Sequence, residues 1–302
     1  MPIIPPEIEL VTQQFTQFSN LSEVATGGFK VVYRCEISGH AEALKLIEIP
    51  NDPEIEDAEA FRNEMFGRTK REIEALQKCA IQELVKLGAL MPVRVAIGNR
   101  EFVAYSEEFL DGPNLWQLIR TSRTTNTMPD EVELKTLMKA GLRTIRALWK
   151  HGYIHRDIKP LNVMKLNDPA RPFVFLDLGI AFSVIESSLT PNPAHIPGTL
   201  PYMAPEMFAA DFRQNVDFRS DLYSLAVTVY QYGSHQHPIL ERPENDFQTV
   251  SRLLRERPKP LRSVAPALSI PFCSMIDQML RKQPALRPSN ITAMLAQLET
   301  QR

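Results

Sequence analysis

Four polar residues in the middle of the chain have the types and spacing that chemistry on a phosphate group needs. Asp157 and Lys159 lie in the run His155-Arg156-Asp157-Ile158-Lys159-Pro160-Leu161-Asn162, and Asp177 follows fifteen positions after Asn162. A carboxylate can accept a proton from an attacking hydroxyl, and an ammonium can neutralise charge on the group in transfer. Amide and carboxylate oxygens are ligands for Mg²⁺, so Asn162 and Asp177 suit a metal site. The alternative is a solvated loop with incidental charges.

Two short apolar runs predict how Asn162 and Asp177 come together. Residues 163–166 and 173–176 are typical of buried strands, and Asn167-Asp168-Pro169 supplies turn chemistry between them. A hairpin of this kind places Asn162 and Asp177 at neighbouring strand ends. The spacing therefore favours one shared site for the two side chains.

With Asp177-Leu178-Gly179, this segment resembles the catalytic machinery of Hanks-type serine/threonine protein kinases. The resemblance implies that Asp157 is the catalytic base, that Lys159 neutralises the phosphoryl group, and that Asn162 and Asp177 bind Mg²⁺. It also implies ATP as phosphoryl donor and a Ser or Thr of a protein substrate as acceptor. Gly198-Thr199 fits the Ser/Thr members, with Thr199 bracing Asp157 and Lys159.

The resemblance demands a cationic residue for the ATP phosphates and a carboxylate that holds it. Lys45, in Ala43-Leu44-Lys45, resembles the strand lysine of the family, and Glu72 resembles the helix glutamate that faces it. Glu74 remains an alternative to Glu72. Immobilising a lysine side chain costs up to about 2 kcal/mol of rotamer entropy, and pairing with a carboxylate offsets this cost.

The nucleotide loop departs from the family's Gly-x-Gly-x-x-Gly pattern. Its three glycine positions read Ala25, Gly27 and Lys30, and Gly28 is an additional small residue, so ATP affinity depends on how Lys30 is accommodated. The implied nucleotide-binding residues are Ala25, Gly27, Gly28, Val32, Lys45, Glu72, Glu108 and Leu110.

The segment 108–115 resembles the hinge, whose backbone at Glu108 and Leu110 binds adenine; a plain interlobe loop is the alternative. This register places Glu107 at the gatekeeper position, which is usually apolar. A buried carboxylate needs a partner, so either Glu107 pairs locally or the register slips.

The segment from Gly198 to Glu206 resembles the end of a kinase activation segment. By analogy Asp221 accepts backbone hydrogen bonds from the catalytic loop, and Arg287 pairs with Glu206. The candidate sites of an activating phosphate are Ser187, Ser188 and Thr190, and the alternative is rigid proline-rich packing without a phosphate.

The implied fold is α+β and bilobal, with a small antiparallel sheet and one helix in the N-lobe and a mainly helical C-lobe. We expect an N-terminal strap over 1–20, the N-lobe over 21–110 and the C-lobe over 111–302, with the kinase domain at about 20–298. Periodicity predicts a hairpin over 24–37, strands at 43–47, 93–97 and 101–105, and a helix over 53–78 that Gly67 could divide. A long helix begins near Pro129-Asp130, with an apolar stripe of Val132, Leu134, Met138, Leu142, Ile145 and Leu148.

Composition narrows the class of protein further. In 302 residues, 34 Lys plus Arg balance 36 Asp plus Glu, so charge gives no reason to expect nucleic acid or a membrane as partner. Cys35, Cys79 and Cys273 are far apart, and the N-terminus lacks a secretory signal, so we expect a cytoplasmic protein.

The kinase resemblance covers nearly the whole sequence, so we expect control by a regulatory partner chain or by self-association. Two rival functions remain. One is a catalytically weak or inactive pseudokinase that acts as a binding scaffold. The other is a kinase of small molecules, which Ala204-Pro205-Glu206 disfavours because this motif shapes a peptide shelf in the family.

Overall fold

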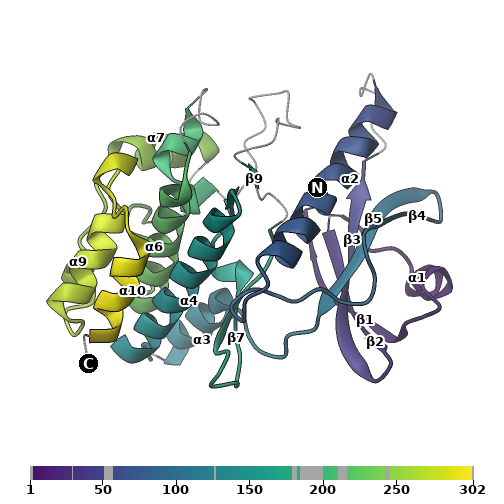
Figure 1. The fold of residues 1–302 in the computed structure, drawn as a ribbon, viewed down its shortest axis with the longest axis horizontal. Helices are drawn as coiled ribbons and strands as arrows, with labels where there is room; N and C mark the ends of the chain where they lie inside the picture. Colours follow the sequence, from purple (N-terminus) through teal and green to yellow (C-terminus); the bar gives the residue numbers. More distant parts are fainter. Residues whose placement is uncertain are drawn as a thin grey trace. The chain divides into compact units, whose positions relative to one another are not determined.

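A computed structural model describes residues 3–28, 30–50, 57–125, 127–178, 182–183, 200–209, 216–241 and 245–300. The chain forms two compact units. Unit 1 comprises Met1–Ala80 and Val85–Asp111, and unit 2 comprises Ile81–Leu84 and Gly112–Arg302. Unit 1 carries an antiparallel sheet and unit 2 is mainly helical, which confirms the expected α+β, bilobal class (Figure 1).

The sheet of unit 1 has the strand order β1-β2-β3-β5-β4 and is antiparallel throughout. Its strands are β1 (Ser19–Gly27), β2 (Lys30–Ile37), β3 (His40–Ile49), β4 (Val93–Ile97) and β5 (Arg100–Glu108). Ser38 and Gly39 both have positive φ, 51° and 78°, as a tight two-residue turn between β2 and β3 requires. The short turn thus fixes the register of β2 against β3.

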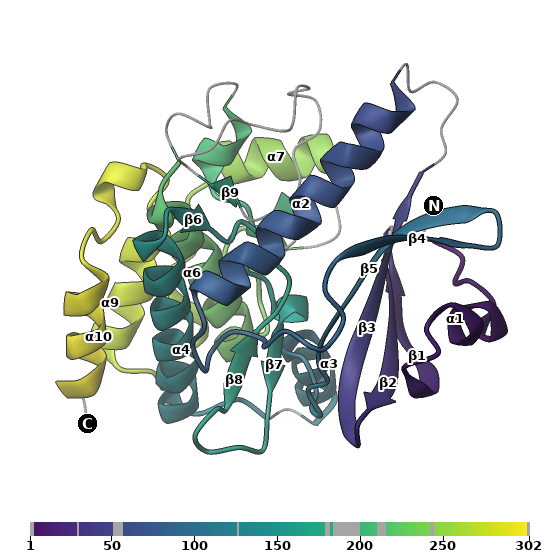
Figure 2. The same cartoon turned by 45° about the vertical axis from the view of Figure 1, so that its right-hand side comes forward.

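The two faces of the sheet have different covers. Helix α1 (Ile8–Gln14) lies within the expected strap, where no helix was predicted, and it packs Val11 and Phe15 onto an apolar face formed by Val31, Tyr33, Cys35, Leu44, Leu46, Phe102 and Ala104. Helix α2 (Ala58–Lys78) lies on the opposite side of the sheet (Figure 2). It runs through Gly67 without a break, so Gly67 does not divide the predicted helix. Tertiary packing outweighs the cost of one helical glycine, about 1 kcal/mol.

Unit 2 is built around α6 (Phe218–Ser234), every residue of which is buried except Arg219. The surrounding helices are α3 (Leu115–Thr125), α4 (Glu131–Lys150), α7 (Asp246–Arg255), α8 (Leu261–Val264), α9 (Ile270–Met279) and α10 (Ile291–Thr300). Short strands β6 (Tyr153–Ile154), β7 (Val163–Lys165), β8 (Phe173–Phe175) and β9 (Phe182–Ser183) complete the unit. Single 3-10 turns are η1 (Pro160–Asn162), η2 (Leu200–Tyr202), η3 (Pro205–Phe208) and η4 (Pro284–Leu286).

Helix α4 begins as predicted, with the Asp130 side chain accepting a hydrogen bond from the amide of Glu133. The predicted stripe is fully buried from Leu134 onward, but Val132 is 71% exposed and was wrongly included. Two residues before Leu134 in the first turn, Val132 points about 200° away from it around the helix. Among the described residues, no helix is long and apolar enough to cross a bilayer.

Candidate active site

In unit 2, two donors converge on the carboxylate of Asp157. The ammonium of Lys159 lies 2.8 Å from Asp157 Oδ2, and Asn162 Nδ2 donates to the same oxygen at 2.7 Å and to the Asp157 carbonyl at 3.0 Å. The single turn η1 between Lys159 and Asn162 brings them to the same side of the loop. Three residues flagged by the sequence therefore form one hydrogen-bonded group.

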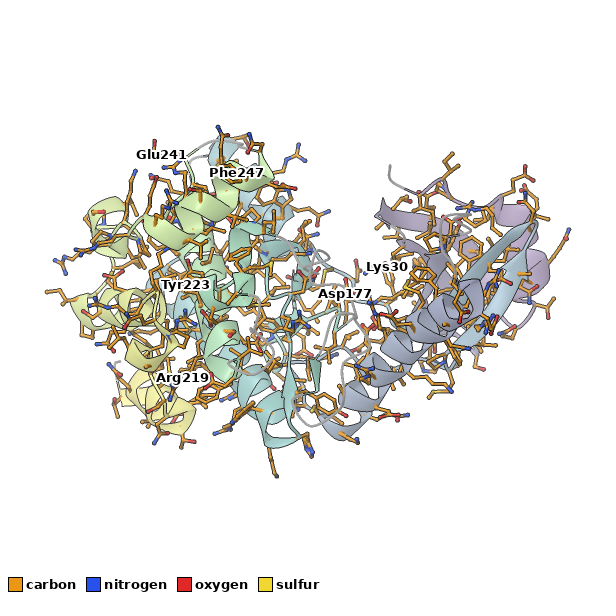
Figure 3. All side chains as sticks on the ribbon, turned by 90° about the horizontal axis from the view of Figure 1, so that it is seen from above. Lys30, Asp177, Arg219, Tyr223, Glu241 and Phe247 are labelled. Carbon is orange, nitrogen blue, oxygen red and sulfur yellow. The ribbon has the colours of Figure 1, made fainter. Side chains whose placement is uncertain are left out.

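The predicted hairpin brings Asn162 and Asp177 to neighbouring strand ends. Strands β7 and β8 pair Val163 with Phe175, and the amide of Leu176 donates to the Asn162 carbonyl at 2.8 Å. Asp177 follows directly in the left-handed region, with φ of 55° (labelled in Figure 3). Asn162 uses its amide nitrogen on Asp157, so its oxygen Oδ1 is the atom suited to a cation. An amide oxygen beside a carboxylate fits Mg²⁺, which takes few protein ligands and keeps waters and phosphates.

Burial shifts the pKa values of two side chains in the loop of residues 155–159. Desolvation raises the pKa of Asp157, against the opposing effects of the Lys159 ammonium and the Asn162 hydrogen bond. A raised pKa moves a carboxylate toward the range in which a general base works best. His155 is fully buried, and desolvation lowers its pKa to about 4, so the ring is neutral at physiological pH.

Asp221, on α6, holds the backbone that leads into Asp157. Its two carboxylate oxygens accept from the amides of His155 at 2.8 Å and Arg156 at 2.9 Å, which confirms the predicted contact. Arg156 has φ of 66°, a left-handed conformation that costs energy outside glycine. The two hydrogen bonds stabilise this conformation and so fix the direction of Asp157.

The predicted pair between Arg287 and Glu206 is also confirmed. Two guanidinium nitrogens donate to the two carboxylate oxygens at 2.6 and 2.7 Å, and the Arg287 side chain is fully buried. The guanidinium lies 5.0 Å from the ring centroid of Tyr223 on α6 (labelled in Figure 3). This bidentate pair ties η3, which contains Glu206, to the segment between α9 and α10.

In unit 1, Lys45 forms a buried ion pair with Glu107. The Nζ to Oε2 distance is 2.6 Å, and the two side chains are 6% and 2% exposed. The pair resolves the question raised by a carboxylate at the gatekeeper position: Glu107 pairs locally. Lys45 Nζ also lies 5.4 Å from the ring centroid of Tyr105, close enough for a cation–π contact.

The structure distinguishes the two glutamates proposed for the helix. Glu72 is buried at 1% exposure, whereas the side chain of Glu74 is 51% exposed and lies 3.9 Å from Lys78. Glu72 is thus the better candidate to face the sheet. Its pairing with Lys45 stays a prediction.

The sheet of unit 1 aligns predicted nucleotide-binding residues that are far apart in the sequence. Cross-strand pairing puts Ala25 opposite Val32, Val32 opposite Lys45 and Lys45 opposite Tyr105, so one row on one face of the sheet contains three predicted nucleotide residues. Gly27 pairs with Lys30, and Gly28 has φ of 55° at the turn, where glycine is favoured. The contacts with adenine proposed for Glu108 and Leu110 stay predictions, and the Glu108 amide itself donates to the Lys86 carbonyl at 2.9 Å.

No sequence pattern predicted a link between the N-terminal strap and the β1–β2 hairpin. The amide of Ile3 donates to the Gly28 carbonyl at 2.8 Å, and the Ile3 side chain is buried with α1. Thr199 and the candidate phosphosites Ser187, Ser188 and Thr190 lie outside the described residues.

The family model of the protein kinase domain matches residues 18–298 of this chain. This chain belongs to the protein kinase family. Members of the family use ATP and Mg²⁺ and act on protein substrates, and the resemblance to Hanks-type serine/threonine kinases is confirmed.

Relatives come from bacteria and animals. The chain is 27% identical to the serine/threonine-protein kinase PknB of Mycobacterium leprae over 63% of its own length and 29% of that protein. It is 27% identical to the serine/threonine-protein kinase pkn2 of Myxococcus xanthus over 91% of its own length and 31% of the relative. It is 33% identical to the dual specificity mitogen-activated protein kinase kinase mek-1 of Caenorhabditis elegans over 50% of its own length and 42% of the relative. The chain thus spans less than half of each of these proteins.

Proposed function

We propose that this protein kinase is an active serine/threonine kinase that transfers the γ-phosphoryl group of ATP to Ser or Thr hydroxyls of proteins. The observation that carries the proposal is the convergence of Lys159 and Asn162 on the carboxylate of Asp157. A positioned carboxylate with an adjacent ammonium is what proton removal from an acceptor hydroxyl and stabilisation of a phosphoryl group require.

Each residue near Asp157 has a proposed role. Asp157 accepts the proton of the acceptor hydroxyl, and Lys159 neutralises charge on the phosphoryl oxygens. Asn162 and Asp177 hold Mg²⁺, which when bound neutralises phosphate charge. Thr199 braces Asp157 and Lys159.

The proposed nucleotide-binding residues all lie in unit 1 and within the proposed kinase N-lobe of residues 21–110. Lys45 binds the phosphates, Glu72 supports Lys45, and the backbone of Glu108 and Leu110 binds adenine. The small side chains at Ala25, Gly27 and Gly28 let the hairpin approach the nucleotide, and Val32 contributes apolar surface.

A pseudokinase scaffold is the competing function, and the irregular glycine loop with Lys30 favours it. Its second support was an acidic gatekeeper without an obvious partner. The ion pair of Glu107 with Lys45 accounts for that residue and weakens the scaffold alternative.

The decisive experiment incubates the purified chain with labelled ATP, Mg²⁺ and a generic protein substrate. The variant is Asp157→Asn, and Asp168→Asn is the matched control because Asp168 lies in the exposed β7–β8 turn. We expect labelled phosphoserine or phosphothreonine with the wild type and the control, and none with Asp157→Asn. Equal absence in all three samples would favour the scaffold instead.

Control of the enzyme is also part of the proposal. We assign it to a partner chain or to self-association, acting with or without phosphorylation of Ser187, Ser188 or Thr190. Phosphosite mapping of a fully active sample tests the phosphorylation route, which fails when all three residues are unmodified. We also propose a cytoplasmic location, which the wide spacing of Cys35, Cys79 and Cys273 along the sequence supports.

A further inference from the structure

The charge of Glu107 lies on the same face of the sheet as the predicted phosphate-binding lysine. Strands β3 and β5 pair Lys45 with Tyr105 and Ala43 with Glu107. Side chains alternate along a strand, so Tyr105 and Glu107 share a face with Lys45. The small Ala43 opposite Glu107 lets the long Lys45 side chain reach diagonally to the carboxylate, a neighbour relation typical of antiparallel strands.

Because it is buried, this ion pair holds its two side chains in place more firmly than a surface pair would. With exposures of 6% and 2%, both charges have left bulk water, so water screens their attraction little. Exposed pairs such as Lys78 with Glu74 exchange freely with solvent and hold neither side chain firmly. An ammonium has three N–H donors, so binding a carboxylate does not exhaust its capacity for phosphate oxygens.

We propose that Glu107 is a positioning residue that holds the Lys45 ammonium in place for the triphosphate of the nucleotide. Glu107 acts through Lys45 and does not itself touch the phosphates. This inference rests on the proposed function, in which Lys45 binds ATP. It assigns to a strand residue at the hinge a part of the role that the family resemblance gives to Glu72 alone.

The test compares Glu107→Gln with the wild type and with Glu42→Gln. Glutamine keeps the size of the side chain and removes its charge. Glu42 is a matched control because it is a buried carboxylate at 8% exposure on the opposite face of the same sheet, where it accepts from the Ala89 amide at 2.9 and 3.0 Å. Binding of Mg²⁺-ATP is measured by equilibrium titration, and the KM values for ATP and for the protein substrate are measured separately.

We expect Glu107→Gln to weaken ATP binding and raise the KM for ATP by about tenfold, with the KM for the protein substrate unchanged. Glu42→Gln is expected to leave both KM values as they are. A second measurement follows the rate at which an amine-reactive probe labels Lys45, read by mass spectrometry. This rate rises in Glu107→Gln, because the amine loses a carboxylate that favours its charged, unreactive form.

The outcomes separate this inference from the proposed function. If the wild type binds ATP and phosphorylates substrate while Glu107→Gln matches it in ATP affinity and in Lys45 labelling, the positioning role is wrong and the kinase function stands. If Glu42→Gln weakens ATP binding as much as Glu107→Gln does, the effect is a general one of buried charge, and the inference again fails. If the wild type binds no ATP, both proposals fall together.

Discussion

Acid should destabilise unit 2 through His155. The ring is fully buried, and desolvation lowers its pKa to about 4 from the ordinary 6.5. The unfolded chain therefore binds more protons than the folded chain between these two values. The stabilising contribution of the neutral ring is complete above pH 6.5 and is lost progressively as the pH falls toward 4.

The size of the effect follows from the pKa difference. One pKa unit corresponds to 1.36 kcal/mol, so His155 costs about 2 kcal/mol of unfolding free energy at pH 5 and about 3 kcal/mol at pH 4, relative to neutral pH. His237 has a similarly lowered pKa and adds to the total loss, so the wild type alone does not isolate His155. The variant His155→Gln removes the titrating group and isolates its share.

Intrinsic fluorescence is suited to this measurement because both tryptophans, Trp116 and Trp149, lie in unit 2. Urea unfolding of the wild type and of His155→Gln at neutral pH and at about pH 5 gives two free-energy differences. We expect the advantage of the wild type over the variant to shrink by about 2 kcal/mol in acid. The control is His151→Gln, at an exposed position. We expect the free energy of unfolding of this variant to change with pH by the same amount as that of the wild type. If the free energy of unfolding of His155→Gln also changes with pH as that of the wild type does, the reasoning is refuted.

Three further predictions concern the stability and local rigidity of the fold. Arg287→Met leaves Glu206 buried without its bidentate partner and should lower the free energy of unfolding by about 3–5 kcal/mol in urea titrations, with partial recovery on adding Glu206→Gln. Gly141→Ala should lower the free energy of unfolding by about 1–3 kcal/mol in the same assay, because a Cβ at this position would collide with the side chain of Leu225 on α6. Ile3→Pro removes the amide that donates to Gly28, so hydrogen exchange in the β1–β2 turn should accelerate; unchanged exchange would show that the strap does not restrain the hairpin.

The sequence predicted the candidate site best where the residues of the site are close together along the chain. Asp157, Lys159 and Asn162 lie within six positions of one another, so a loop and one turn suffice to bring them together. The hairpin that adds Asp177 was equally readable, because its strands are short apolar runs separated by turn residues. Local chemistry and local structure pointed the same way in this region.

Contacts that depend on strand register could not be obtained in this way. Whether Lys45 reaches Glu107 depends on how β3 and β5 align, and a shift of one residue would turn each side chain to the other face. The strap helix α1 was missed because its helical stretch is short and its burial comes from apolar residues of the more distant strands β2, β3 and β5. The prediction that Val132 is buried was wrong because an apolar residue in the first turn of a helix can face solvent at little cost in free energy.

Two buried ion pairs among the described residues, Arg287 with Glu206 and Lys45 with Glu107, illustrate different uses of charge. Arg287 spends all five guanidinium donors on protein acceptors: the Glu206 carboxylate and the backbone carbonyls of Arg219, Arg281 and Lys282. Such a saturated cation can only brace the fold. The ammonium of Lys45 is held by a carboxylate from its own sheet, on the face where the predicted nucleotide residues align. An apolar pair would fill the same space without the cost of desolvating two charges, so stability alone does not explain this pair. Our proposal that Lys45 binds the phosphates of ATP would account for the pair, because a ligand phosphate would then meet a cation already fixed in position.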